Sequence, residues 1–295
     1  MSSPSLDAEL VALYWTVSGP VEVHVGREWS LFDWADRCAE ARKVGFAGLG
    51  IWHADLEHVL ETRSLAEMKK VFDDNGLRHL ELEFLMDWFL DPGDERRQAS
   101  DATRELLLGA AAELGAHHVK IGNIPGTPCE LPQLTERFGE LCAEAAERTD
   151  AKIVYEFMPF DANVRSIESV LAVVAGAGAP NGGIAIDTWH MSKLGIAPDE
   201  LRRIPAEYLS WVELSDGGRE DMDDLIDETV NHRRLPGEGE FDLRGYIAVC
   251  EECGYDGPWG VEVLSDELRN QSLETIFRRA YDTTASQFAH ERSST

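Results

Sequence analysis

The chain has 295 residues, 43% of them hydrophobic, and carries 27 Lys and Arg residues against 55 Asp and Glu residues, a formal net charge of −28. Such a surface repels phosphate backbones and anionic membranes, so neither nucleic acid nor a membrane is an expected partner. No apolar run approaches the roughly 20 residues of a membrane span, and the five cysteines imply no disulfide framework, so we expect a soluble, cytoplasmic protein.

Eight short apolar runs alternate with amphipathic helical patterns along the chain. Several runs are apolar throughout, as strands buried on both faces are. The eight runs cover residues 11–15, 48–52, 79–85, 117–122, 152–157, 183–187, 209–214 and 260–264. The helical patterns between them include residues 31–44, 68–73, 95–114, 132–148, 166–174, 198–204 and 242–253. Ser64 and Glu67 have the spacing of a capping box ahead of the second helical pattern.

This alternation predicts an α/β fold, a (β/α)8 TIM barrel, in a single domain that covers residues 1–295. The barrel itself is expected over about residues 8–265, followed by a C-terminal helix and tail over 266–295. The last helical pattern, 268–288, is expected to pack outside the barrel or against another subunit, so a homo-oligomer is possible. Residues 290–295 are expected to form a frayed tail.

Four adjacent runs end in carboxylates, and in a TIM barrel such strand ends form the active site. The four are Glu156, Asp187, Glu213 and Glu262. Four acids cannot all ionise in one low-dielectric site without a compensating charge, so either some are protonated or a divalent cation lies between them. Oxygen ligands favour Mg²⁺ or Mn²⁺, with Co²⁺ or Zn²⁺ also possible.

Two further polar residues follow these strand ends. His190, three residues after Asp187, could donate to a substrate oxygen or move a proton, or could simply bond to backbone. Arg233 and Arg234 precede a rigid Pro-Gly turn, which would hold one arginine over the site and leave the other at the surface.

Four tryptophans also fall at or just beyond strand ends. They are Trp15, Trp52, Trp88 and Trp189. Each alone is more typical of a core, but together they would form an apolar wall for the C–H faces of a small, carbohydrate-like substrate.

The strand-end motifs resemble those of the xylose isomerase-like TIM barrels, specifically the sugar isomerase and epimerase branch with ketose 3-epimerases and inosose dehydratases. The resemblance is most specific in Ile-Asp-Thr-Trp-His-Met at 186–191, in Arg-Arg-Leu-Pro-Gly-Glu-Gly at 233–239 and in Val-Glu-Val at 261–263. It implies that Glu156, Asp187 and Glu262 are metal ligands and that Glu156 and Glu262 exchange protons with the substrate. It also implies that His190 and Arg233 contact substrate oxygens.

The sequence departs from the family pattern on two strands. The seventh strand of the family usually ends in a histidine ligand, within His-x-x-Asp, whereas this chain has Glu213-Leu214-Ser215-Asp216. Glu213 could still bind metal, or could mark a changed reaction or lost metal binding. The second strand often ends in an acid, but here it ends in Trp52 before His53, which indicates a substrate other than a simple free ketose.

The resemblance and the carboxylates together predict a metal-dependent isomerase or epimerase that acts on a sugar, keto-sugar or related polyol. It would remove a proton alpha to a carbonyl through a metal-stabilised enediolate. Loss of a β-leaving group from the same intermediate would instead make the enzyme a lyase or dehydratase. A non-catalytic binding protein on a degenerate barrel is another alternative, whereas the charge of −28 argues against a DNA-repair endonuclease of this fold.

Overall fold

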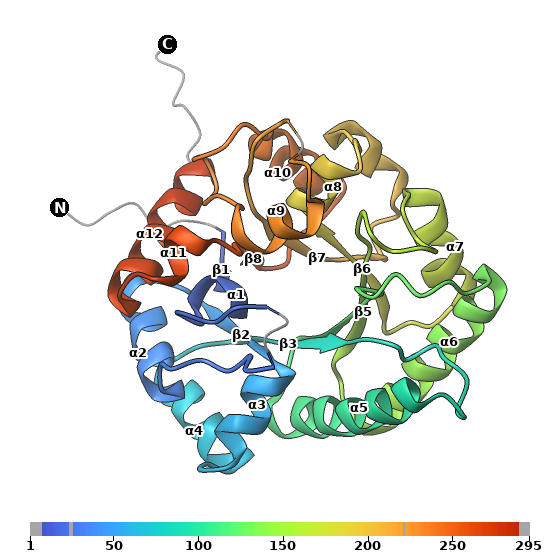
Figure 1. Ribbon diagram of the computed structural model, residues 1–295, viewed down its shortest axis with the longest axis horizontal. Helices are drawn as coiled ribbons and strands as arrows, with labels where there is room; N and C mark the ends of the chain where they lie inside the picture. Colours follow the sequence, from blue (N-terminus) through green and yellow to red (C-terminus); the bar gives the residue numbers. More distant parts are fainter. Residues whose placement is uncertain (1–7, 24–25, 221, 289–295) are drawn as a thin grey trace.

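The computed structural model describes residues 8–23, 26–220 and 222–288 (Figure 1). The expected tail at 290–295 lies outside these residues. No helix in the described ranges is long and apolar enough to cross a membrane.

Eight parallel strands close into a barrel in which each strand pairs with its neighbours in sequence and β8 pairs with β1, which confirms the expected (β/α)8 fold. The strands are β1 (Leu10–Ala12), β2 (Gly48–Trp52), β3 (His79–Leu85), β4 (His118–Ile121), β5 (Lys152–Glu156), β6 (Gly182–Asp187), β7 (Leu209–Leu214) and β8 (Trp259–Val261).

Helices surround this barrel on all sides (Figure 1). They are α1 (Tyr14–Val17), α2 (Trp34–Val44), α3 (His53–Leu60), α4 (Leu65–Asp74), α5 (Glu95–Leu114), α6 (Leu131–Arg148), α7 (Ile167–Ala177), α8 (Thr188–Lys193), α9 (Leu225–Asn231), α10 (Leu243–Glu252), α11 (Asp266–Arg269) and α12 (Leu273–Ala285), with 3-10 turns η1 (Pro198–Arg203) and η2 (Ser286–Phe288). The capping box of Ser64 and Glu67 is present at the start of α4.

The structure corrects the expected bounds of the first strand, the last strand and the last helix. The first strand stops at Ala12, and Trp15 lies on the short helix α1. All four α1 residues are buried, so their apolar run could not be distinguished from a strand by periodicity. The last strand stops at Val261, and the expected helix 268–288 is divided among α11, α12 and η2.

The strands alternate between an outward face that packs against the helices and an inward face. Leu80 and Leu82 of β3 belong to the large core between strands and helices, whereas Glu81 and Glu83 point inward. A small apolar cluster fills part of the interior, formed by Val11, Leu13, Val154, Ala185 and Trp211. Other inward positions carry charged side chains, among them Glu81, Glu83 and Lys120, and these build the site described next.

Candidate active site

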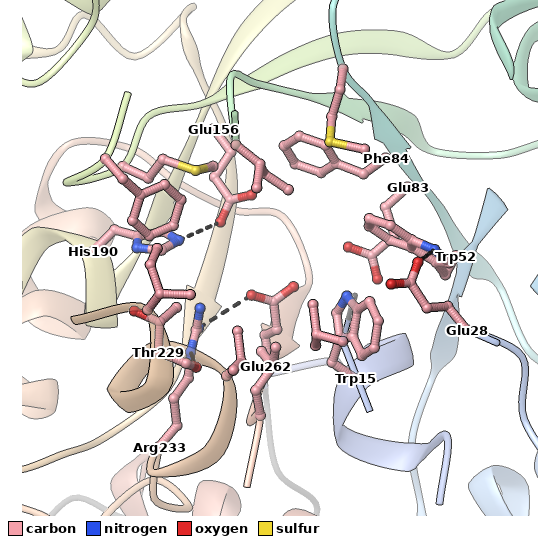
Figure 2. Close-up of a pocket in the computed structure, with 18 residues that line it drawn as sticks. Trp15, Glu28, Trp52, Glu83, Phe84, Glu156, His190, Thr229, Arg233 and Glu262 are labelled. Carbon is pink, nitrogen blue, oxygen red and sulfur yellow. Dashed lines mark hydrogen bonds and ion pairs between the residues drawn. The ribbon is translucent and has the colours of Figure 1, made fainter. Parts of the chain in front are cut away.

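A cavity opens at the C-terminal ends of the strands (Figure 2). One part of its wall is apolar and includes Trp15, Trp52, Phe84, Met86, Met158 and Phe160. The polar residues that line it are Glu28, Glu83, Glu156, His190, Thr229, Arg233 and Glu262. The cavity therefore combines an aromatic wall with a group of carboxyls, as a site for a small polar ring would.

The four strand-end acids of the sequence analysis converge at this cavity. Glu156, Asp187, Glu213 and Glu262 each offer an oxygen within 4.8 Å of the others, and all four are buried. Glu156 and Glu262 line the cavity, whereas Asp187 and Glu213 are fully buried and do not line it. Glu262 follows β8 directly, and its backbone N–H donates to Leu214 O of β7 at 3.2 Å, which holds it in line with the strand ends.

A buried lysine, which the sequence analysis missed, lies among these acids. Lys120 of β4 is fully buried, and its Nζ lies 2.7 Å from Glu213 Oε1 and 2.8 Å from Glu262 Oε1. It also lies 3.8 Å from Glu156 Oε2. The compensating charge that the acids require is therefore partly built into the chain. The sequence held one signal for this ion cluster, the lysine inside the apolar run 117–122. A lysine is almost never fully buried without a partner, so its place on a buried strand indicates acidic neighbours.

Two glutamates of β3 were also missed. Glu81 Oε1 lies 3.3 Å from Lys120 Nζ and 3.3 Å from His118 Nε2, and Glu83 Oε2 lies 3.1 Å from Lys120 Nζ. Their signal was the alternation of apolar and acidic residues in 80–84, which places both carboxyls on one face of a strand.

Arg233 provides a second cation beside the acids. Its Nη1 donates to Asp187 Oδ2 at 2.8 Å and to Glu262 Oε2 at 3.2 Å, while its Nε donates to Thr229 O at 3.0 Å. The other arginine of the pair, Arg234, does not line this cavity.

The loop after Arg233 is held by one carboxylate. Asp216 accepts hydrogen bonds from the backbone N–H groups of Gly217, Gly237, Gly239 and Phe241, at 2.8–3.0 Å. A Cβ at Gly239 would meet Asp216 Oδ1 at 2.2 Å, so this close approach requires a glycine. The motif 233–239 thus wraps around Asp216, which fixes the backbone that carries Arg233.

His190 lies against the acids, at the cavity. Its Nε2 is 3.3 Å from Glu156 Oε1 and 3.4 Å from Asp187 Oδ2, and its Nδ1 has no hydrogen-bond partner among the described residues. It therefore faces both the acid cluster and the space where a substrate would lie.

Only two of the four tryptophans line the cavity. Trp15 and Trp52 do, with ring centroids 5.0 Å apart in an edge-to-face arrangement. The expected wall positions of Trp88 and Trp189 are corrected, because neither lines the cavity. Trp88 packs against Phe138 and Tyr155 on the outward face of the barrel.

Trp189 also points away from the cavity. Its ring packs between Phe241 and two cations, with Lys193 Nζ 5.0 Å and Arg233 Cζ 5.4 Å from its centroid. It supports the arginine and does not form a wall for a ligand.

The buried charges divide the carboxyls into two kinds. Burial alone would raise the pKa of Glu156, but the Lys120 ammonium, together with His190, outweighs burial and lowers this pKa to about 2. Burial raises the pKa of Glu262 above its usual range, and the neighbouring Glu156 and Asp187 add to the rise against the opposing Lys120 and Arg233. Burial and Glu262 raise the pKa of Glu213 well above its usual range.

The donor set fits a divalent cation that prefers oxygen. Four carboxyls converge, and within the described part of the chain Glu213 Oε2 is buried without a hydrogen-bond partner. Glu213 uses its other oxygen for Lys120 and for Trp211 Nε1, at 2.7 and 2.8 Å. Unpartnered carboxylate oxygens in an acidic cluster are stabilised by a cation.

Comparison with known proteins identifies relatives of the same architecture. A family model described as the xylose isomerase-like TIM barrel matches residues 38–285. The 3-dehydroshikimate dehydratase of Pseudomonas aeruginosa is 28% identical over 227 residues, which cover 77% of this chain and 35% of the relative. The inosose isomerase of Bacillus velezensis is 22% identical over 246 residues, covering 78% of this chain and 82% of the relative.

A solved structure agrees over almost the whole chain. A crystal structure of an IOLI protein with a bound zinc atom superposes with a TM-score of 0.78 at 18% identity, covering 95% of this chain and 98% of that one. This chain aligns with only 35% of the length of the two Pseudomonas dehydratases, so these relatives are much longer proteins.

Proposed function

Because the chain belongs to the xylose isomerase-like TIM barrel family, we propose that it is a divalent-metal-dependent isomerase or epimerase of a keto-sugar or keto-polyol. The reaction is removal and return of a hydrogen alpha to the carbonyl. The observation that carries this proposal is the pair Glu156 and Glu262, which line one cavity and belong to one cluster of four converging carboxyls.

The metal is assigned to Glu156, Asp187, Glu213 and Glu262, whose oxygens lie within 4.8 Å of one another. A bound divalent ion supplies Lewis acidity that polarises the substrate carbonyl and acidifies the neighbouring C–H group. Mn²⁺ and Mg²⁺ suit four carboxyl ligands best, and the zinc of the IOLI protein keeps Zn²⁺ and Co²⁺ as candidates.

The two glutamates have different parts in the proton transfer. Glu156, whose pKa is held at about 2, is ionised and takes the alpha hydrogen. Glu262 returns a proton in this proposal, because its side chain lines the same cavity. Return to the opposite face gives an epimer, and return to the neighbouring carbon gives an isomer.

Four other side chains position the substrate in this proposal. The guanidinium of Arg233 lies beside Glu262 and offers positive charge where a substrate oxygen becomes negative. His190 Nδ1, which is buried and lacks a partner in the described chain, is available to a substrate oxygen. Trp15 and Trp52 exclude water and pack against C–H groups of the substrate.

The test is hydrogen exchange at the alpha carbon. Protein reconstituted with Mn²⁺ is incubated with inosose and with keto-hexoses in D2O, and the alpha C–H signal is followed by NMR. We expect enzyme-dependent loss of this signal for at least one keto-polyol, abolished by EDTA and restored by Mn²⁺. Failure of every keto-polyol to exchange with metal-loaded protein would contradict the proposal.

A lyase is the second candidate, because the similar Pseudomonas aeruginosa enzyme is a 3-dehydroshikimate dehydratase. Elimination begins with the same removal of an alpha hydrogen, followed by departure of a β-hydroxyl group. An absorbance of a conjugated product that grows as the C–H signal disappears would favour the lyase over the isomerase.

A further inference from the structure

The cavity has two polar ends, and only one belongs to the proton-transfer chemistry. Figure 2 shows Glu156, His190 and Arg233 on one side of the cavity and Glu83 and Glu28 on the other. We call the region of Glu83 and Glu28 the far end. If the substrate carbonyl lies beside Glu156, His190 and Arg233, the part of the substrate opposite the carbonyl lies at the far end.

Glu83 presents an oxygen with no partner to this far end. The residue is 1% exposed and lines the cavity. Its Oε2 lies 3.1 Å from Lys120 Nζ, which fixes the orientation of the carboxyl, whereas its Oε1 has no hydrogen-bond partner in the described residues. A buried polar atom without a partner is costly, so a ligand that offers a hydroxyl at this point is stabilised.

Glu28 and the aromatic wall complete the far end. Trp52 Nε1 donates to Glu28 Oε2 at 3.2 Å, so the indole that forms the wall also holds this carboxyl at the cavity. Trp15, Trp52 and Phe84 provide apolar faces beside both acids. Carboxyls next to aromatic rings suit a ring-shaped polyol, with C–H faces toward the rings and hydroxyls toward the acids.

Among the described residues, no lysine or arginine lines the far end. The nearest cation, Lys120, lies 3.1 Å from Glu83 Oε2 but does not line the cavity, and its charge is shared with Glu81, Glu213 and Glu262. Among the described residues that line the cavity, Arg233 is the one lysine or arginine, and it lies on the proton-transfer side. A carboxyl group carries no positive charge in either protonation state, so Glu83 can bond to hydroxyls but cannot neutralise an anion. Burying an anionic group without a counter-charge is strongly unfavourable.

Building on the proposed function, we infer that the far end is a subsite for hydroxyl groups in which Glu83 is the specificity-determining residue. The substrate is therefore an uncharged polyhydroxylated ketone, and a ring that directs a carboxylate to the far end is excluded. The two named relatives differ in this respect, since inosose is an uncharged ring and 3-dehydroshikimate carries a carboxylate.

The first test compares these two rings as ligands of the Mn²⁺-reconstituted protein by isothermal titration calorimetry. We expect inosose to bind about 100-fold or more tightly than 3-dehydroshikimate, because the carboxylate lacks a counter-charge. Equal or tighter binding of 3-dehydroshikimate, or no binding of inosose, overturns the inference.

The second test changes Glu83. Glu83→Leu should weaken inosose binding about tenfold or more, while Glu83→Gln, which still bonds to a hydroxyl, should stay within about threefold of wild type. Glu81→Gln is the matched control, because Glu81 precedes Glu83 on the same inward face and contacts Lys120 but does not line the cavity. It should leave inosose affinity unchanged. An unchanged affinity in Glu83→Leu overturns the subsite.

Hydrogen exchange separates this inference from the proposed function. If inosose exchanges its alpha hydrogen normally and Glu83→Leu binds it as wild type does, the function stands and the subsite is wrong. If inosose binds in a Glu83-dependent manner and no keto-polyol exchanges, the subsite stands and the proposed function is wrong.

Discussion

Lys120 Nζ on β4 lies 2.7 Å from Glu213 Oε1 on β7, three strands further round the closed barrel. Both residues are fully buried, so this ion pair crosses the barrel interior out of contact with solvent. It gives the acid cluster a fixed positive charge and leaves Glu213 Oε2 without a hydrogen-bond partner among the described residues. The pair is therefore part of the fold and of the proposed metal site at once.

Lys120→Met should destabilise the metal-free protein. It leaves several buried carboxyls without their cation, and removal of one partner of a buried pair typically costs about 3–5 kcal/mol. Urea unfolding in EDTA measures this loss. Mn²⁺ should raise the unfolding midpoint more in the variant than in wild type, because one positive charge near the ion is gone. Lys152→Met is the control, since Lys152 is only partly buried and lies 3.3 Å from Ser210 Oγ. Equal stability of the two variants would contradict the role of Lys120.

Glu262→Gln should abolish turnover and leave the fold intact. The amide fills the same space but cannot exchange a proton, and a general acid or base typically contributes about 10²–10⁴-fold to the rate. Alpha-hydrogen exchange measures the loss, with circular dichroism as the check on folding. Activity within about tenfold of wild type would remove Glu262 from the proton transfer.

Glu213→His should keep metal binding and shift its preference toward Co²⁺ and Zn²⁺, because imidazole suits these ions better than a carboxylate does. Competition titrations with Mn²⁺ measure the preference. Good metal binding with lost turnover would instead assign Glu213 a part in the chemistry. An unchanged preference together with an unchanged rate would show that Glu213 touches neither metal nor substrate.

Asp216→Ala should lower activity without lowering metal content. The carboxylate accepts three backbone hydrogen bonds from the loop that follows Arg233, so its loss lets the guanidinium move. Misplacement of a positioning group by about 1 Å can cost about 100-fold in rate. Metal content by mass spectrometry and exchange rates should therefore diverge in this variant, and a wild-type rate would show that Arg233 is held by other contacts.

The free energy of unfolding should fall as the solution is acidified, partly through His117. Burial, with His118, His79 and Lys152 nearby, lowers the pKa of His117 to about 3, against about 6.5 in an unfolded chain. Between these values the unfolded chain binds a proton that the folded chain does not, so stability falls as pH falls. This group contributes a slope of at most about 1.4 kcal/mol per pH unit.

His117→Gln isolates that contribution, because glutamine does not titrate. Urea unfolding at pH 6.5 and 4.5 (about the upper half of the window for this pKa) should show a smaller loss of stability in the variant than in wild type. Identical losses in the two proteins would show that His117 does not titrate on unfolding in this range.

Periodicity predicted the barrel well because its signal is local. The bounds of β2, β3, β7 and α5 agree with the expected residue ranges. The alternation of strand and helix then implied closure, which the strand order confirms. The prediction failed where a buried strand and a buried helix would have the same apolar sequence. This is the case after Ala12, where a short buried helix stands in place of the expected end of the strand.

The site was predicted less completely, for a different physical reason. Strand-end carboxylates could be read from the sequence because a barrel brings strand ends together. Lys120 was missed because its partners lie on other strands, and a single sequence does not show which charges meet inside the barrel. Trp88 was assigned to the wall because distance along the chain does not reveal whether a side chain faces the cavity or the helices.

The contact between Lys120 and Glu213 also has an evolutionary consequence. A histidine at position 213, as in the family pattern, is neutral and would remove one of the two shortest contacts of the lysine. A lysine at 120 is therefore favoured by a carboxylate at 213 and disfavoured by an imidazole there. We expect positions 120 and 213 to covary among homologues, so that a substitution at one position is accompanied by a substitution at the other. Lineages that alter only one should pass through a less stable ancestor.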